Sequence, residues 1–272
     1  MIPDSYSNIL AYIQDKQFGC RHAILIDPAN QSPEIASNRV LVAIESGCKL
    51  IMVGGSTNTS NEDVNATVVA IQEALELKNR TASQNSNGGN FVDWQIPVVL
   101  FPGGGHALSP AADAITFMML MNSTDPKFLV QEQKKGAPYL FKYGIEALPT
   151  GYVVCSPGGK VGEVGKVNLI KENDLEDVNE WALCAKMFGF KLLYLEAGSG
   201  AHTPVSTELI ETATKIEGLT ILVGGGINDS ASANNAKNAG ADWIVTGTLA
   251  EKCDNLEELK NKLTQIIEII NY

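Results

Sequence analysis

A tyrosine and a glutamate follow the apolar run Lys191–Leu193, at the start of the glycine-rich stretch YLEAGSGA (194–201). Glu196 carries a carboxylate, a group that binds hydroxyl groups and accepts their protons in general base catalysis. Tyr194 stands two residues earlier, and side chains two residues apart lie on the same face of a strand. We therefore expect Glu196 and Tyr194 to act together. The simpler interpretations are that Glu196 binds loop amides and that Tyr194 packs in the core.

Glycines follow three successive apolar runs near the C-terminus. The three motifs are YLEAGSGA (194–201), VGGGI (223–227) and VTGT (245–248). Backbone N–H groups in such loops bind phosphate without any net positive charge, and in barrel proteins the loops after the last two strands commonly do so. We expect the last two motifs to form a phosphate site to which Ser199 and Gly200 contribute. Tight turns alone are the simpler interpretation.

Oxygen-bearing side chains end the first two apolar runs. LIDP places Asp27 there, and MVGGST places Ser56 and Thr57 there. Taken alone, an aspartate at a strand end more often caps the next helix. In a barrel the first two strands are neighbours, so Asp27 and an oxygen of Ser56 or Thr57 would reach the same cation. Mg²⁺ uses one or two protein oxygens when phosphates and water complete its shell, so the sequence favours Mg²⁺ opposite the phosphate site.

Eight short apolar runs, most of them followed by a stretch with helical periodicity, have to position these residues. The runs are apolar at odd and even positions alike, which is typical of strands buried on both faces of a parallel sheet. In a chain of 272 residues this pattern predicts an α/β fold, a (β/α)8 TIM barrel formed as one domain by residues 1–272. An open doubly wound sheet fits less well, because glycines and polar residues lie at the C-terminal ends of nearly all the runs. The predicted strands are 23–27, 49–55, 97–103, 114–120, 151–155, 191–197, 220–226 and 242–248. The predicted helices are 33–46, 61–79, 126–147, 174–187, 204–216, 229–239 and 256–270.

The connection between the third and fourth predicted strands is unusually short. About ten residues, GGHALSPAAD, separate the two strands. A parallel crossover through a full helix needs a dozen residues or more. The sequence therefore predicts a modified barrel, in which a short flexible segment replaces this helix. His106 in this segment and His202 after the 194–201 motif are expected to be surface or capping residues.

The charge and the cysteines restrict the function classes. Lysine and arginine total 20 against 31 aspartates and glutamates, a formal net charge of −11. The resulting field repels polyanions, which excludes nucleic acid as a partner. The five cysteines are scattered and form no C-x-x-C pair. This pattern favours reduced thiols in a cytoplasmic protein.

Apolar segments indicate how the chain meets membranes and other copies of itself. The N-terminal residues 1–17 have charges within an amphipathic helical pattern, so they are not expected to be a signal peptide. The apolar runs fall far short of the roughly 20 residues of a membrane span, which predicts at most peripheral membrane contact. Apolar stretches such as LTQIIEII (263–270), expected to be exposed, favour a homo-oligomer.

Taken together, the motifs resemble a known family. The motifs LIDP, MVGGST, LFPG, ADAITFMMLMNSTDP, PTGYVV, YLEAGSGA, VGGGI and TGT follow the order, and about the spacing, found in geranylgeranylglyceryl phosphate synthases and their bacterial heptaprenylglyceryl phosphate relatives, over roughly residues 20–250. The resemblance implies a modified (β/α)8 barrel that lacks its third helix. It implies a Mg²⁺-dependent prenyltransferase that joins a prenyl diphosphate, expected to be geranylgeranyl diphosphate, to the 3-hydroxyl of sn-glycerol 1-phosphate. The product is a precursor of archaeal-type ether lipids.

The resemblance also assigns roles to residues. Asp27 and Ser56 resemble the metal ligands, and Glu196 and Tyr194 are the expected catalytic residues. The residues that resemble the glycerol phosphate site are Tyr194, Leu195, Glu196, Ala197, Gly198, Ser199, Gly200, Gly225, Gly226, Gly247 and Thr248. The chain departs from the family in two places. It reads DPAN where D-P-D-K is frequent, which removes an acidic and a basic group near the metal, and Thr248 takes the place of an asparagine.

The substrates implied by the resemblance need a dry groove and a base. Phe101, Pro102 and Tyr143 lie near the gap left by the missing helix and are expected to line the groove, although core packing is the more common role of aromatic residues. Mg²⁺ on Asp27 would stabilise charge on the leaving diphosphate, and Glu196 would accept the hydroxyl proton.

Two other functions stay open from the residues. A sugar-phosphate isomerase or aldolase on the same barrel would share the glycines, yet it would need a catalytic lysine or an acid–base pair on opposing strands. No predicted strand ends in lysine. A non-catalytic phosphate-ligand binder would keep the phosphate site without the metal.

Overall fold

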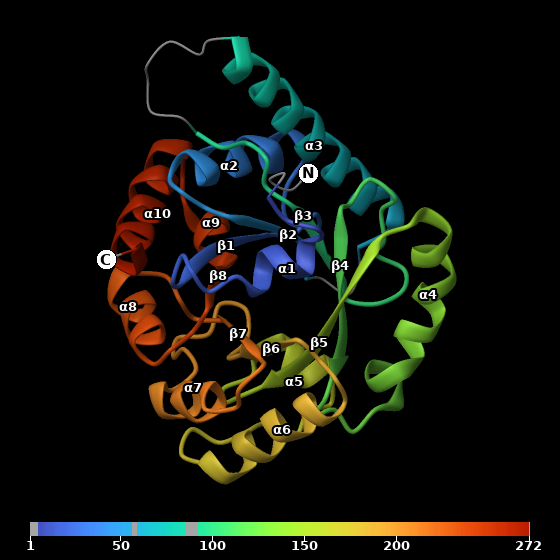
Figure 1. Ribbon diagram of the computed structural model, residues 1–272, viewed down its shortest axis with the longest axis vertical. Helices are drawn as coiled ribbons and strands as arrows, with labels where there is room; N and C mark the ends of the chain where they lie inside the picture. The colour runs from blue at the N-terminus through green and yellow to red at the C-terminus, as the bar shows by residue number, and fades with distance from the viewer. Residues whose placement is uncertain (1–4, 56–58, 85–91, 272) are drawn as a thin grey trace.

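The computed structural model describes residues 5–55, 59–84 and 92–271. Its eight strands are parallel and pair in chain order, and β8 pairs back onto β1, so the sheet is a closed barrel (Figure 1). This confirms the predicted barrel. The strands are β1 (Arg21–Ile26), β2 (Leu50–Gly54), β3 (Val98–Phe101), β4 (Ala114–Leu120), β5 (Glu146–Val154), β6 (Leu192–Glu196), β7 (Thr220–Gly224) and β8 (Trp243–Thr246).

Helices surround the barrel, and several begin at a residue whose side chain caps the helix. Ser32 caps the helix that begins at Pro33, and Asp229 forms a capping box with Ser232. The expected start near Thr203 was wrong, because the Ser206 side chain accepts the capping hydrogen bond instead. The helices are α1 (Ile9–Gln14), α2 (Pro33–Glu45), α3 (Asn61–Gln84), the π-helix η1 (Lys127–Gln131), α4 (Glu132–Tyr143), α5 (Gly159–Val164), α6 (Leu175–Met187), α7 (Thr207–Thr214), α8 (Ser230–Asn238), α9 (Thr248–Lys252) and α10 (Leu256–Asn271).

Helices long and apolar enough to cross a membrane are not found in the described parts of the chain.

The largest error of the sequence prediction lies between α4 and β5. A helix was expected over 126–147, but Gly144 adopts a left-handed conformation (φ 66°) and ends α4 at Tyr143. Glu146 then begins β5, five residues before the predicted start. The short helices α5 and α9 were not predicted, because each follows a glycine and neither has a side-chain cap.

The connection from β3 to β4, residues 102–113, contains no helix, as predicted. It is instead anchored by side chains of the flanking helices α3 and α4. The Leu108 N–H group donates to Asn61 Oδ1 of α3 (2.7 Å), and the Gly105 N–H group donates to Glu132 Oε2 of α4 (2.8 Å). The ring of helices is therefore interrupted between α3 and α4.

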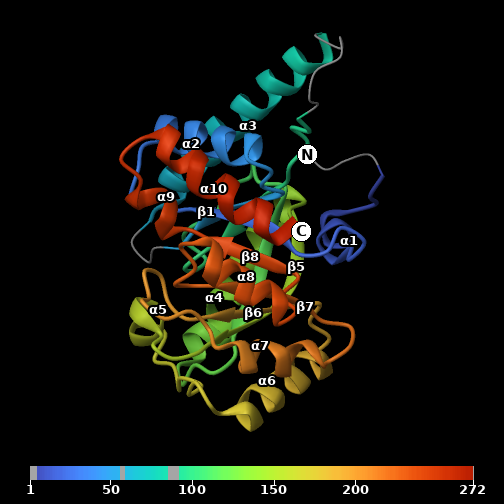
Figure 2. The same ribbon diagram turned by 90° about the vertical axis from the view of Figure 1, so that its left-hand side faces the viewer.

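Apolar side chains form one core inside the barrel and another between the strands and the helices. Figure 2 shows α10 beside α2 and α8, with which it packs. In the segment 263–270 the side chains of Leu263, Ile266, Ile267 and Ile270 are buried. The expectation that this segment is exposed was therefore wrong, because its apolar side chains are buried where α10 packs against its neighbours.

The N-terminal helix α1 covers the end of the barrel where the strands begin (Figures 1 and 2). Glu146 accepts hydrogen bonds from the N–H groups of Ile9 and Leu10 at the start of α1. The buried guanidinium of Arg21 donates to three carbonyls at the end of α1 and lies 4.1 Å above the Trp243 ring. These contacts fix α1 in place and leave the opposite end of the barrel for a site.

Candidate active site

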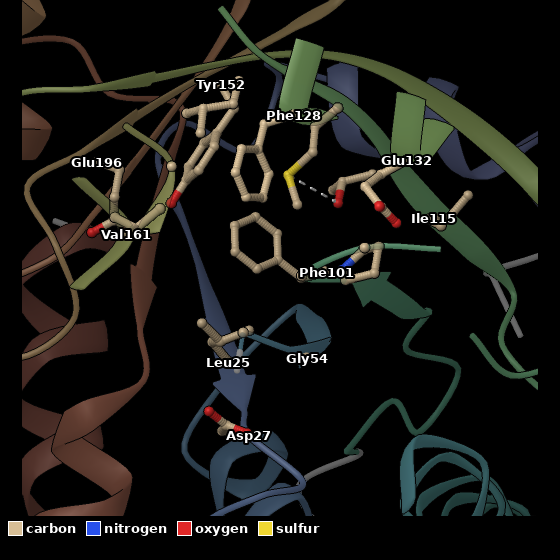
Figure 3. Close-up of a pocket in the computed structure, with 18 of the residues that line it drawn as sticks. Leu25, Asp27, Gly54, Phe101, Ile115, Phe128, Glu132, Tyr152, Val161 and Glu196 are labelled. Atoms are coloured by element: carbon tan, nitrogen blue, oxygen red, sulfur yellow. Dashed lines mark hydrogen bonds between the residues drawn. The ribbon is translucent and has the colours of Figure 1, made fainter. Parts of the chain in front are cut away.

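A cavity of about 380 Å³ lies at the C-terminal ends of the strands (Figure 3). Its mouth is polar and is formed by the loops after β1, β5, β6 and β8. The polar residues of the mouth include Asp27, Asn30, Lys160, Glu196, Ser199, Thr248 and Glu251. This is the face where barrel enzymes carry their catalytic residues.

From the mouth the cavity continues into an apolar groove. Phe101, Ile115 and Phe128 form part of its wall (Figure 3). Pro102 also lines the cavity. Phe101 and Pro102 therefore line the groove, as predicted. Tyr143 does not, because it is half exposed on α4 and stacks on Tyr139 with ring centroids 4.7 Å apart.

The Glu196 carboxylate lies between the mouth and the barrel interior. Its Oε1 accepts a hydrogen bond from the Gly198 N–H group at 2.6 Å, and the hydroxyls of Tyr152 and Tyr194 donate to it as well. Burial raises the pKa of Glu196 to about 7, against an ordinary value of 4.5, and the three hydrogen bonds oppose this shift only in part. Near neutral pH this carboxyl therefore exchanges a proton readily.

Three aromatic rings form a layer beneath Glu196. The centroids of Phe101 and Tyr152 are 5.6 Å apart, and the Tyr194 ring lies 5.3 Å from each of them. Burial, together with the charge of Glu196, raises the pKa of both tyrosines well above the usual range. The tyrosines therefore stay protonated and can only donate to the carboxylate.

The glycines of β7 and its loop make room for this arrangement. A Cβ on Gly224 would lie 2.0 Å from the Tyr194 hydroxyl oxygen, and a Cβ on Gly225 would lie 2.2 Å from Glu196 Oε1. Gly225 also has a φ of +82°, which disfavours any other residue. The glycine motif after β7 therefore packs directly against Tyr194 and Glu196.

The structure separates the predicted glycerol phosphate residues into two groups. Those that line the cavity are Glu196, Ser199, Gly247 and Thr248. The hydroxyl oxygens of Ser199 and Thr248 are 3.0 Å apart, so they join the loops after β6 and β8. Tyr194, Gly198, Gly200, Gly225 and Gly226 are not among the residues that line the cavity. The side chains of Leu195 and Ala197 point into the core between the strands and the helices.

On the opposite side of the mouth, Asp27 follows β1. Its Oδ1 accepts a hydrogen bond from the Ala29 N–H group at 2.9 Å. A Cβ on Gly55 would lie 3.5 Å from Asp27 Oδ2, so this glycine (φ +120°) keeps the space beside the carboxylate open. Ser56, the second expected metal ligand, and Thr57 lie outside the described residues.

The chemistry of Asp27 fits Mg²⁺, which prefers oxygen ligands. Within residues 5–55, 59–84 and 92–271, no three or more His, Cys, Asp or Glu side chains converge on one point. A metal held by protein side chains alone is therefore not supported there. A Mg²⁺ ion that takes one or two protein oxygens and completes its shell with substrate oxygens and water needs no such cluster.

Sequence reasoning missed three residues of the cavity. Tyr152 lies beside Tyr194 in the register of β5 and β6, and its place in the motif PTGYVV was the available signal. Lys160 belongs to the unpredicted α5, and nothing in the sequence indicated that it faces the mouth. Glu132 looked like a solvated helix residue, yet it is buried and accepts from Lys135 Nζ at 2.8 Å. His106 and His202 are exposed, as expected.

Comparisons with known proteins agree with this geometry. The model of the PcrB family matches residues 83–269. A geranylgeranylglyceryl phosphate synthase of Thermoplasma volcanium is 42% identical over 253 residues, which cover 92% of this chain and 93% of the relative. A similar solved structure is the crystal structure of (S)-3-O-geranylgeranylglyceryl phosphate synthase from Thermoplasma acidophilum in complex with its substrate sn-glycerol-1-phosphate. The two sequences are 34% identical, the TM-score is 0.87, and the match covers 98% of this chain and 99% of that chain.

A second solved structure, the wild-type GGGPS from Thermoplasma volcanium, is 39% identical with a TM-score of 0.85, over 97% of this chain and 98% of that chain. The identity and coverage are high in both sequence and structure, and the matched region includes β6, β7 and β8 with their glycine motifs. The chain therefore belongs to the PcrB family, with the geranylgeranylglyceryl phosphate synthases as its relatives.

Proposed function

We propose that this chain is a prenyltransferase that joins a prenyl diphosphate, geranylgeranyl diphosphate in the first instance, to the 3-hydroxyl of sn-glycerol 1-phosphate. The product is an ether lipid precursor. The observation that carries the proposal is the form of one cavity. A polar mouth with Asp27 on one side and Glu196 on the other continues into a groove walled by Phe101, Ile115 and Phe128. A phosphorylated alcohol suits the mouth, and a long apolar chain suits the groove.

The acceptor substrate is proposed to bind along the loops after β6 and β8. Ser199 and Thr248 offer two hydroxyls 3.0 Å apart, and Gly247 leaves the backbone open to a phosphoryl group. Glu196 lies on the same wall and would bind a glycerol hydroxyl. The relative from Thermoplasma acidophilum, solved with sn-glycerol-1-phosphate, supports this choice of acceptor.

Glu196 is the proposed general base. In the reaction the bond between the allylic carbon and the diphosphate oxygen breaks, the ether bond to the glycerol oxygen forms, and the hydroxyl proton passes to Glu196. A pKa of about 7 suits this role near neutral pH. Tyr152 and Tyr194 hold the carboxylate in position by donating to it. Tyr194 does not reach the cavity wall, so we assign it a positioning role rather than a contact with substrate.

Asp27 is the proposed protein ligand of Mg²⁺. When bound, Mg²⁺ supplies Lewis-acid stabilisation of the negative charge that develops on the leaving diphosphate. Asp27 would hold the metal on the side of the mouth opposite Glu196, and the groove wall would keep water from the cation-like allylic carbon.

Several broader properties are proposed as well. The described elements form one barrel domain, and a cytoplasmic location agrees with five cysteines of which none forms a disulfide. A homo-oligomer with at most peripheral membrane contact is proposed, because Phe141 on α4 is 92% exposed and Met187 at the end of α6 is 83% exposed. Nucleic acid is not a proposed partner, since the net charge is −11.

The test is incubation of the chain with labelled sn-glycerol 1-phosphate and prenyl diphosphates of 15 to 35 carbons, with and without Mg²⁺. Ether product, identified by chromatography and mass spectrometry, is expected with at least one prenyl diphosphate and only with Mg²⁺. The enantiomer sn-glycerol 3-phosphate serves as the matched control. If no pair of substrates gives an ether, the proposal is wrong.

A further inference from the structure

The charges of the cavity mouth pose a problem for a site that receives phosphoryl groups. Four carboxylates face the cavity, those of Asp27, Glu132, Glu196 and Glu251. Each substrate of the proposed reaction carries phosphoryl groups, whose negative charges these carboxylates repel. A positive charge at the mouth would reduce this repulsion and bind the anions directly.

The loop after β1 does not supply this positive charge. Its sequence is DPANQ (27–31), which contains no lysine or arginine. The neutral side chain of Asn30 is already engaged, because its Nδ2 donates to Glu251 Oε1 of α9 at 2.9 Å. A basic side chain that supplies this charge would have to lie on another wall of the cavity.

Among the described residues that line the cavity, Lys160 is the single basic side chain. It lies at the start of α5, next to Val161, which Figure 3 shows beside Glu196. Its ammonium forms no ion pair or hydrogen bond with the described residues. Two other lysines of this region are occupied, since Lys135 pairs with Glu132 at 2.8 Å and Lys166 pairs with Asp125 at 2.9 Å.

The backbone around Lys160 is fixed against the candidate phosphate loop. The Gly158 N–H group donates to the Ala197 carbonyl at 2.9 Å. A Cβ on Gly159 would lie 3.3 Å from Gly198 Cα, and a Cβ on Gly198 would lie 2.6 Å from the Gly158 carbonyl carbon. The two loops therefore touch along their backbones, which sets Lys160 beside the loop that carries Ser199.

We propose that Lys160 is the phosphoryl-binding cation of this site, and that its ammonium forms a charge-assisted hydrogen bond with a phosphoryl group held at the mouth. The proposal rests on the proposed function for the identity of the substrates, but it concerns a binding property that can be measured without turnover. The shared chemistry is a phosphate oxygen, which belongs either to the glycerol phosphate or to the diphosphate.

The experiment measures binding of two probes, sn-glycerol 1-phosphate and inorganic pyrophosphate, to the full chain by calorimetry without Mg²⁺. The variants are Lys160→Met, which keeps the length of the side chain but removes its charge, and Lys160→Arg, which keeps the charge. Lys215→Met is the matched control, because Lys215 is exposed at the end of α7, away from the residues that line the cavity.

Loss of one charge-assisted hydrogen bond is expected to weaken binding of at least one probe by about tenfold to a hundredfold in Lys160→Met. Lys160→Arg is expected to stay within about threefold of the unmodified chain, and Lys215→Met is expected to bind as the unmodified chain does. The probe that is weakened identifies the phosphoryl group. Unchanged binding of both probes in Lys160→Met would overturn the proposal, and so would an equal loss in Lys160→Met and Lys160→Arg or in Lys215→Met.

The same variants separate this inference from the proposed function. If the unmodified chain makes no ether product but loses probe binding in Lys160→Met, the proposed function fails and the role of Lys160 stands. If the unmodified chain makes product and Lys160→Met keeps both its probe binding and its KM values, the role of Lys160 fails alone.

Discussion

Replacement of Glu196 by glutamine is expected to raise stability while it removes activity. The glutamine amide has nearly the shape of the carboxyl group and its oxygen can still accept from Gly198, but it cannot ionise or take up a proton. Removal of a general base lowers the turnover number by about 10² to 10⁴. The stability effect follows from the raised pKa of the buried carboxyl.

The magnitude can be worked from this pKa. A carboxyl that binds its proton more tightly in the folded chain stabilises the fold at low pH, and this contribution is lost as the pH rises through about 7. The difference between 4.5 and about 7, at about 1.4 kcal/mol per unit of pKa, amounts to about 3 kcal/mol. The titratable groups that face Glu196 are Tyr152, Tyr194 and Cys155, whose pKa values are all raised, so none of them ionises between pH 5 and 8.

The assay is urea unfolding of the unmodified chain and of Glu196→Gln at pH 5 and pH 8, with Glu217→Gln as the control at an exposed position. Glu196→Gln is expected to be more stable than the unmodified chain by about 2 to 3 kcal/mol at pH 8 and by less than about 1 kcal/mol at pH 5. Equal effects at the two pH values, or a less stable variant at pH 8, would refute the burial argument. Turnover within tenfold of the unmodified chain would refute the role as general base.

Three further predictions concern other parts of the molecule. Asp27→Asn is expected to abolish Mg²⁺-dependent turnover while calorimetric binding of sn-glycerol 1-phosphate persists, and loss of both would contradict the assignment of Asp27 to the metal. Gly225→Ala is expected to lower the free energy of unfolding by more than about 2 kcal/mol. Gly189 has a similar φ of +83° but open space around it, so Gly189→Ala is expected to lower the free energy of unfolding by only about 1 kcal/mol. Equal losses in the two variants would show that contact with Glu196 is unimportant. Arg21→Met, at the far end of the barrel, is expected to lower the free energy of unfolding by about 2 to 4 kcal/mol with unchanged KM values, and a changed KM would show that the two ends are coupled.

The barrel could be predicted because the strand runs are apolar at odd and even positions alike, and glycines and polar residues lie at the C-terminal ends of nearly all of them. The boundary between α4 and β5 could not be predicted, because residues 145–147 continue the helical pattern and only the left-handed conformation of Gly144 ends the helix. The same limit applies to α5 and α9, which follow glycines and are too short to show a periodicity.

Part of the candidate site followed from period two and from glycine motifs. These signals placed Glu196 beside Tyr194 and predicted that Gly225 lies nearby. Tyr152 and Lys160 could not be found in this way, because their positions depend on the register of β5 against β6 and on how the loop after β5 packs. Such contacts join residues more than 30 positions apart, and no local pattern encodes them.

With Glu196 as the proposed base, the aromatic layer beneath it limits where the proton can go. A proton taken up by this carboxylate meets the rings of Phe101, Tyr152 and Tyr194 below it and the cavity mouth above it. It must leave by the route that the diphosphate and the ether product also use. In the proposed reaction the base would therefore be reset as the mouth empties, which would link the return of the enzyme to its starting state to the departure of its products.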